Sequence, residues 1–198
     1  MSDTSWTSQP QSDDDRVLDG PALVALSHPV RVQIVRLLRQ LGPSTASRLA
    51  ASLGLNSGAT SYHLRQLAAA GLVEEADDLG NKRDRWWRAK VRSLYFDSDS
   101  FVREPEAAMG YFNAIATSYA ERIVEFAHQF PTLPGGWSNG ATISDFPLHL
   151  TAAESERMLD EIAAVISSYR RDAHAADTPA EAEDVIVQLQ VMPQLTEA

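Results

Sequence analysis

The 198-residue sequence contains no cysteine, and this absence excludes several kinds of site at once. Disulfide scaffolds, thiolate metal sites and cysteine nucleophiles all require a thiol, so only carboxylates and the five histidines remain as metal ligands. The sequence also lacks an apolar run of the roughly 18 residues that span a bilayer, and its start has no signal-peptide pattern. We therefore expect a cytoplasmic protein that does not contact a membrane.

Positive charge is scarce overall but concentrated in one part of the chain. The formal net charge of -10 argues against nucleic acid, because phosphate binding depends on Lys and Arg. Residues 23–96 nevertheless hold eleven basic and five acidic side chains, whereas residues 97–198 hold five basic and seventeen acidic ones. This asymmetry favours a DNA-binding domain joined to an acidic partner domain. The excess of Arg over Lys is typical of a GC-rich bacterial genome.

The first half of the chain has the apolar spacing and the capping residues of a series of short helices. Helix starts are expected at Pro29, Ser44 and Asn56 or Ser57. The first of these helices has a predicted buried stripe of Val30, Ile34, Leu37, Leu38 and Leu41. The last, over about 57–70, is expected to end at Gly71 in a left-handed conformation.

After Gly71 the apolar period changes from helical to extended. Residues 72–89 predict a strand, a turn at Gly80 and Asn81 and a second strand. Short helices followed by a basic hairpin indicate a mainly α fold with a small β-hairpin wing, the winged helix-turn-helix.

Three stretches resemble the ArsR-type winged-helix repressors over residues of about 20 to 96. They are HPVRVQIVRLL, SRLAASLGLNSGATSYHLRQLAAAGLVEE and the hairpin ending RWWRA. The resemblance implies that the helix beginning near Asn56 enters the major groove and that the hairpin contacts phosphates or the minor groove. Metal sensing, the best-known activity of that family, is not expected here, because the helix that bears cysteine in its arsenic and cadmium sensors has the sequence TASRLAASL.

The predicted recognition helix over about 57–70 has two distinct faces. A helical wheel places Thr60, Leu64 and Leu67 on a core side, opposite small residues, hydroxyl groups and one long cation. Small side chains permit close approach to base edges, and Arg65 has two open roles, base recognition or phosphate binding. The alternative is an ordinary surface helix. Predicted DNA contacts are Ser57, Gly58, Ala59, Ser61, Tyr62 and Arg65, with Asn81, Lys82, Arg83 and Arg85 from the wing at about 77–90. In that wing, Asp78 and Asp84 are the acids weighed against six cations.

A long helix is predicted from Pro105 to about Gln129, with apolar residues at alternating intervals of three and four. Such a heptad seam favours a subunit interface, and a two-fold dimer doubles the contact with DNA. The alternative is a helix buried within its own domain. The predicted dimer residues are Met109, Phe112, Ala116, Tyr119, Ile123 and Phe126.

The remaining sequence predicts a strand over 143–150, a helix with a capping box at Thr151 and Glu154, and a strand over 185–192. We divide the chain into a disordered acidic tail (1–16), a winged helix-turn-helix DNA-binding domain (17–96) and a helical α+β domain for dimerisation or effector binding (97–198).

The sequence contains no motif typical of catalysis or metal binding. The histidines are scattered without ligand spacing, and no GxSxG or phosphate-loop pattern occurs, so we expect no catalytic residues, no metal and no cofactor. Two classes remain. One is a homodimeric DNA-binding regulator, a repressor by resemblance, with an unknown small-molecule or protein effector. The other is a winged-helix module that binds a protein partner and has no specific DNA site.

Overall fold

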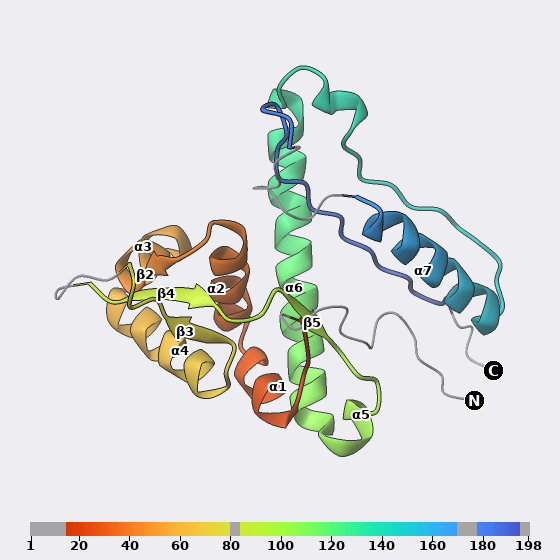
Figure 1. Ribbon diagram of the computed structural model, residues 1–198. Coiled ribbons are helices and arrows are strands. Elements are labelled where there is room, and N and C mark those ends of the chain that lie inside the picture. Colours follow the sequence, from red (N-terminus) through yellow and green to blue (C-terminus); the bar gives the residue numbers. More distant parts are fainter. Residues whose placement is uncertain (1–14, 80–83, 170–177, 195–198) are drawn as a thin grey trace. The chain divides into compact units, whose positions relative to one another are not determined.

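The computed structural model describes residues 15–79, 84–169 and 178–194, and it divides into two compact units, Met1–Pro147 and Leu148–Ala198. Each unit is described by itself (Figure 1). Residues 1–14 of the predicted acidic tail lie outside the described residues. Asp15 and Arg16, predicted to belong to that tail, instead form part of a strand. No helix in the described residues is both long and apolar enough to cross a membrane.

Four short helices open the first unit. They are α1 (Gly20–Leu26), α2 (Pro29–Gln40), α3 (Ala46–Leu53) and α4 (Ser57–Ala69). Thr45, not the expected Ser44, caps α3, because its hydroxyl accepts from Arg48 N at 3.3 Å. Asn56 caps α4, and Gly71 follows that helix with φ +70°, as predicted.

A three-stranded antiparallel sheet completes the winged helix. Its order is β2 (Ser44–Thr45), β4 (Trp86–Ala89) and β3 (Val73–Glu75). The predicted hairpin is confirmed, although its tip at Gly80 and Asn81 lies outside the described residues. Trp87 is buried against the helices, while Trp86 is half-buried beneath the guanidinium of Arg48, 4.8 Å from the ring centre. The mainly α fold with a small wing is therefore confirmed.

A second, two-stranded sheet was not predicted. In it, β1 (Asp15–Val17) pairs in parallel with β5 (Ser93–Tyr95). Arg16 extends from β1 to the end of α4, where its Nη1 donates to the carbonyl oxygens of Ala70 at 2.9 Å and Gly71 at 3.2 Å. The N-terminal strand therefore anchors the C-terminal end of α4.

The long predicted helix is present with the expected bounds as α6 (Pro105–Gln129), preceded by α5 (Ser100–Arg103). It packs against α1 and α2 through a face of buried residues (Figure 1). That face consists of Ala108, Tyr111, Ala114 and Ser118. The compact unit thus extends past residue 96, and the domain boundary expected there stays a prediction.

The buried stripe of α2 differs from the predicted one. Ile34 and Leu38 are buried as expected, but Val32 and Val35 replace Leu41, which is 74% exposed, and Val30 and Leu37 are only partly buried. The helix is enclosed on more than one side, because α1, α3, α4 and α6 all contact it. The sequence prediction assumed that only one side of the helix is buried, and it therefore missed the residues that are buried against the other neighbours.

The C-terminal unit contains α7 (Ala152–Ser167), and its predicted capping box is confirmed. Thr151 accepts from Glu154 N at 3.3 Å, and the Glu154 carboxylate accepts from Thr151 N at 2.8 Å. Before it, the first unit ends in short 3-10 helices at Phe130–Thr132 and Trp137–Asn139. The predicted strands over 143–150 and 185–192 are wrong, because neither segment pairs with another strand in the described residues. Apolar alternation makes a segment suited to a sheet, but a strand also needs a hydrogen-bonded neighbour.

Candidate nucleic-acid interface

Helix α4 has the two faces that its sequence predicts. Thr60, Leu64 and Leu67 have no exposed surface and fix the helix to the core. On the other side, small and polar residues are open to solvent. Ser57, Gly58, Tyr62 and Arg65 are exposed, and Ala59 and Ser61 are half-buried. The burial pattern leaves the six predicted contact residues of α4 accessible or partly accessible to a ligand.

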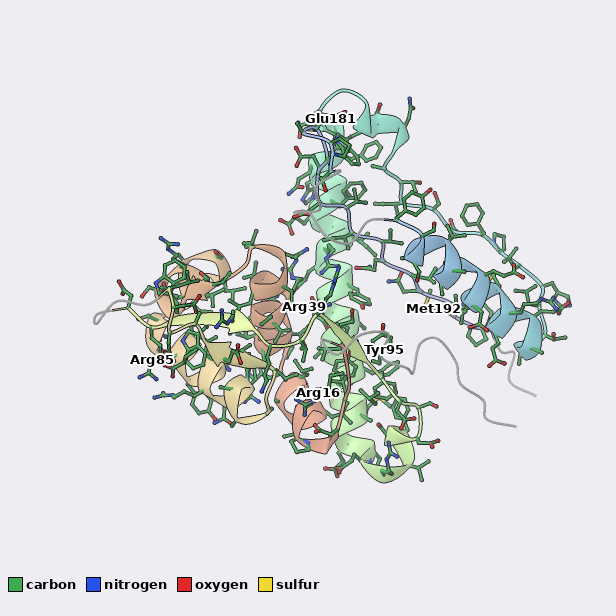
Figure 2. All side chains as sticks on the ribbon, in the orientation of Figure 1. Arg16, Arg39, Arg85, Tyr95, Glu181 and Met192 are labelled. Atoms are coloured by element: carbon green, nitrogen blue, oxygen red, sulfur yellow. The ribbon has the colours of Figure 1, made fainter. Side chains whose placement is uncertain are left out.

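A hollow of about 340 Å³ lies where α3, α4 and the wing meet. It brings together three of the predicted DNA-binding residues, Ser61 and Arg65 from α4 and Arg85 from β3–β4. Figure 2 labels Arg85 on this hairpin. The complete lining is Thr45, Ala46, Ser47, Ser61, Arg65, Asp84, Arg85 and Trp87. Two arginines and two serines converge on this concave surface with one carboxylate, Asp84, so cations outnumber anions in the lining and hydrogen-bond donors for an anion are present.

Ser47 is a lining residue that the sequence analysis missed. It lies in the first turn of α3, two residues after the cap Thr45. Its hydroxyl is a further hydrogen-bond donor in the hollow, and the N-terminal end of a helix favours a nearby anion. A serine at the start of the helix that precedes a recognition helix is a signal that could have identified it.

The wing is less cationic than its sequence suggests. Arg85 pairs with Glu75 at 2.9 Å, and Arg88 pairs with both Glu74 and Asp78 at 3.1 Å. The expectation that Asp78 and Asp84 alone oppose the six cations is therefore wrong. The register of β3 against β4 places Glu74 opposite Arg88, which a list of charges along the chain does not show. Asn81, Lys82 and Arg83 lie outside the described residues, and their DNA contacts stay predictions.

Further positive charge lies on the helices, in a stretch of sequence that contains no acidic residue. The sequence from Gly20 to Val73 contains no acidic residue and five arginines. Three of them are exposed, namely Arg39 on α2, Arg48 on α3 and Arg65 on α4. This acid-free stretch was visible in the sequence and is a stronger electrostatic signal than the wing, because no carboxylate of the same helices opposes it.

Removing the wing's own counter-charge should strengthen DNA binding. We expect Glu75→Gln to raise the affinity for random-sequence duplex a few-fold, because Arg85 would no longer divide its charge between a carboxylate and a phosphate. The effect is modest because Arg85 is 62% exposed and its ion pair is solvent-screened. Glu106→Gln, on α6, is the control. Fluorescence anisotropy measures both, and equal affinities for Glu75→Gln and this control would contradict the expectation.

His63 lies on α4 beside the exposed face and contacts α2. Its ring centre is 4.7 Å from that of His28 and 5.7 Å from that of Tyr62. Its Nδ1 accepts from Arg31 Nε at 3.5 Å, which requires a neutral imidazole at that nitrogen. Burial, and then the neighbouring His28 and Arg31, lower the pKa of His63.

Acid should therefore destabilise the protein through His63. Its folded-state pKa lies below the ordinary value of about 6.5, so protonation favours the unfolded chain. The stability that the neutral ring contributes is complete above about pH 6.5 and is lost as pH falls through the folded pKa. Thermal unfolding between about pH 7.5 and 5 should show a decline that His63→Gln flattens and His128→Gln leaves unchanged. Equal slopes in both variants would contradict this role.

The predicted seam of α6 is largely exposed. Met109, Phe112 and Ile123 are 53%, 43% and 38% exposed, Ala116 is also exposed, and Tyr119 and Phe126 are half-buried. Phe112 also packs edge-on against Phe96 at 4.7 Å, so it contributes to its own unit as well. The face that packs on α1 and α2 is a different one, which leaves the seam available to a partner.

Metal ligands do not cluster in the part of the chain that the structure describes. No group of three or more His, Asp or Glu side chains there has an arrangement that could hold a metal ion.

Comparison with known families gives one match that includes the helices of this site. Residues 26–76 match the family model of a helix-turn-helix domain. The helix-turn-helix domain so identified extends from the end of α1 through α2, α3 and α4 to β3. In helix-turn-helix proteins generally, the second helix of the motif enters the major groove, and α4 occupies the corresponding position in the sequence of this domain. The match covers about a quarter of the chain.

A search of curated proteins finds no relative of this chain. Among solved structures, similar chains include two mutant structures of Lactococcus lactis ZitR, both 14% identical to this chain. For the mutant in the apo form, the similarity covers 73% of this chain and 84% of that one, with a TM-score of 0.32. For the other, it covers 72% and 75%, with a TM-score of 0.31. Similarity at this level carries no functional argument.

Proposed function

We propose that this protein is a transcription regulator that binds double-stranded DNA as a homodimer, with α4 in the major groove and the β3–β4 hairpin on the backbone or in the minor groove. The observation that carries the proposal is the hollow in which Ser61, Arg65 and Arg85 meet beside a helical surface free of acidic residues. Regulators of this kind need a helix that fits into the major groove and cations beside it that contact phosphates. The hollow is lined by residues of both α4 and the wing. The resemblance to ArsR-type proteins favours repression over activation.

The homodimer rests on α6. Its apolar seam is exposed while a separate face binds the rest of the unit, which supports a second copy as the partner of the seam. One winged helix contacts few base pairs, and a symmetric pair doubles the contact. The effector, if the acidic C-terminal region binds one, is a small molecule or a protein.

The test is a salt titration with random-sequence duplex, followed by fluorescence anisotropy. If each subunit neutralises roughly three to five phosphates, log K should fall linearly with log salt by about 0.9 for each phosphate. Binding in dilute buffer that weakens steeply with salt is the expected result. A complex indifferent to salt, or no binding in dilute buffer, would contradict the proposal.

The internal ion pairs of the wing favour a second candidate. Because Arg85 and Arg88 already have carboxylate partners, the hairpin does not require a polyanion to balance its charge. A winged-helix module that binds a protein would then use the same surface. The salt titration separates the two, since such a module would not bind duplex DNA.

A further inference from the structure

Arg48 on α3 contacts the wing through an aromatic ring. Its guanidinium carbon lies over the ring of Trp86, at the start of β4, 4.8 Å from the ring centre. A cation and a tryptophan ring attract each other at such distances, up to about 6 Å. Thr45 brings the two residues together, because it lies opposite Trp86 in the ladder of β2 and β4 while its hydroxyl accepts from Arg48 N at 3.3 Å. Figure 1 shows α3 beside β2 and β4.

The N–H donors of the Arg48 side chain are available to a ligand. The residue is exposed, and within the part of the chain that the structure describes it forms no ion pair. Its hydrogen bonds with Thr45 and Ser52 are made by its backbone. The contact with the ring uses none of the five guanidinium donors, so all of them can bind a phosphate. A side chain that is already held in place also loses less conformational entropy when it binds.

The position of Arg48 within α3 does not favour the helix itself. The N-terminal end of a helix carries a partial positive charge, which favours acidic side chains in the first turn and disfavours cations. The first turn of α3 contains no acidic residue, and Arg48 is the third residue of the helix. The attraction of Trp86 offsets part of this cost. An arginine kept at such a position, and held by a ring, indicates a role in binding more than in stability.

The pair of Arg48 and Trp86 lies beside the hollow next to α4. Neither residue lines the hollow, but the residues directly before them, Ser47 and Arg85, do. Because side chains alternate along β4, the Trp86 ring lies on the opposite sheet face from the lining residue Trp87. Arg48 is therefore outside the hollow. A DNA strand carries one phosphate for each nucleotide, so a duplex bound over the hollow presents further phosphates beyond its edge.

We propose that Arg48 is a further phosphate-binding residue of the DNA interface and that Trp86 is the positioning residue that holds its guanidinium group in place. This role rests on the proposed DNA binding and adds a contact that the sequence does not predict. Arg48 binds one phosphate next to those at the hollow. Trp86 acts only through Arg48, so loss of the ring weakens DNA binding only while the arginine is present.

The experiment is a salt titration of the full chain with random-sequence duplex, measured by fluorescence anisotropy. Arg48→Gln should weaken binding roughly 3- to 10-fold and reduce the slope of log K against log salt by about 0.9, the value for one phosphate. Because Arg48 is exposed, Tm should not fall. Arg157→Gln, which removes an exposed arginine of α7, is the matched control and should change neither affinity nor slope.

Two variants of Trp86 test its positioning role. Trp86→Leu should weaken binding less than Arg48→Gln does, because the charge remains but is no longer held in place. Trp86→Phe keeps an aromatic ring and should bind almost as tightly as the wild type. The double variant Arg48→Gln/Trp86→Leu should bind no more weakly than Arg48→Gln alone, because the ring acts through the arginine. Circular dichroism and Tm check that each variant folds.

The outcomes separate this role from the proposed function. A wild type that does not bind duplex in dilute buffer overturns both. A wild type that binds, with unchanged affinity and salt slope in Arg48→Gln, overturns the role of Arg48 alone, a result that stands even if Trp86→Leu fails to fold. Losses that add in the double variant, or a Trp86→Phe as weak as Trp86→Leu, overturn the positioning role of Trp86.

Discussion

Arg65→Ala should weaken the binding of duplex DNA by about 1–3 kcal/mol, or roughly 5- to 150-fold, without lowering Tm. Arg65 is exposed on α4, lines the hollow with Ser61 and Arg85, and takes part in no ion pair of the described residues. Its whole charge is therefore available to DNA. The core side of α4 is the opposite one, so truncation removes no buried contact.

The same variant decides which of its two roles Arg65 has. If it contacts a phosphate, Arg65→Ala weakens a selected site and random duplex equally, and the salt dependence falls by about one phosphate. If it contacts a base, the selected site is affected far more, and specificity relaxes at one position. Arg103→Ala, on α5, is the matched control for loss of one arginine. Wild-type affinity in Arg65→Ala would remove α4 from the proposed interface.

Ile123→Glu should convert the proposed dimer to a monomer. An unpaired carboxylate at the centre of a packed apolar seam costs about 3–5 kcal/mol, more than most interfaces of one helix pair can absorb. The fold itself should persist, because α6 packs on α1 and α2 through Ala108, Tyr111 and Ala114. The molar mass from light scattering should halve, and affinity for a two-fold-symmetric DNA site should fall steeply because each subunit then binds alone.

The control for this variant lies on the same helix. Asn113→Glu adds the same charge at an exposed position outside the seam, and it should remain a dimer with unchanged circular dichroism. A dimeric Ile123→Glu would show that the seam is not the interface, as would a wild type that is monomeric at the same concentration.

Sequence reasoning succeeded where structure is set locally. The cap at Asn56, the buried side of α4 and both ends of α6 follow from side chains within one or two turns of each other. It failed where two distant segments meet. Pairing of β1 with β5, and of β2 with β4, leaves no signal in segments of two or three residues.

The candidate site shows the same division. Exposure of Ser57 and Arg65 could be predicted because it depends on helical geometry alone. The ion pairs of Arg85 and Arg88 could not, because they depend on how two strands align. The same limit explains why strands were wrongly predicted at 143–150 and 185–192. The apolar residues of these segments are compatible with a strand, but the sequence nearby does not show whether another strand is available to pair with them.

The short strand β1 connects the C-terminal end of α4 with the segment that leads into α6. Arg16 holds the last carbonyl groups beyond α4, while its own strand is bonded to β5, which leads through α5 into α6. A rearrangement that displaces β5 would be transmitted to the C-terminal end of α4, the helix proposed to contact DNA, through the guanidinium group of Arg16. A displacement of β5 would thus reach the end of α4 through the backbone hydrogen bonds between β5 and β1 and through the side chain of Arg16.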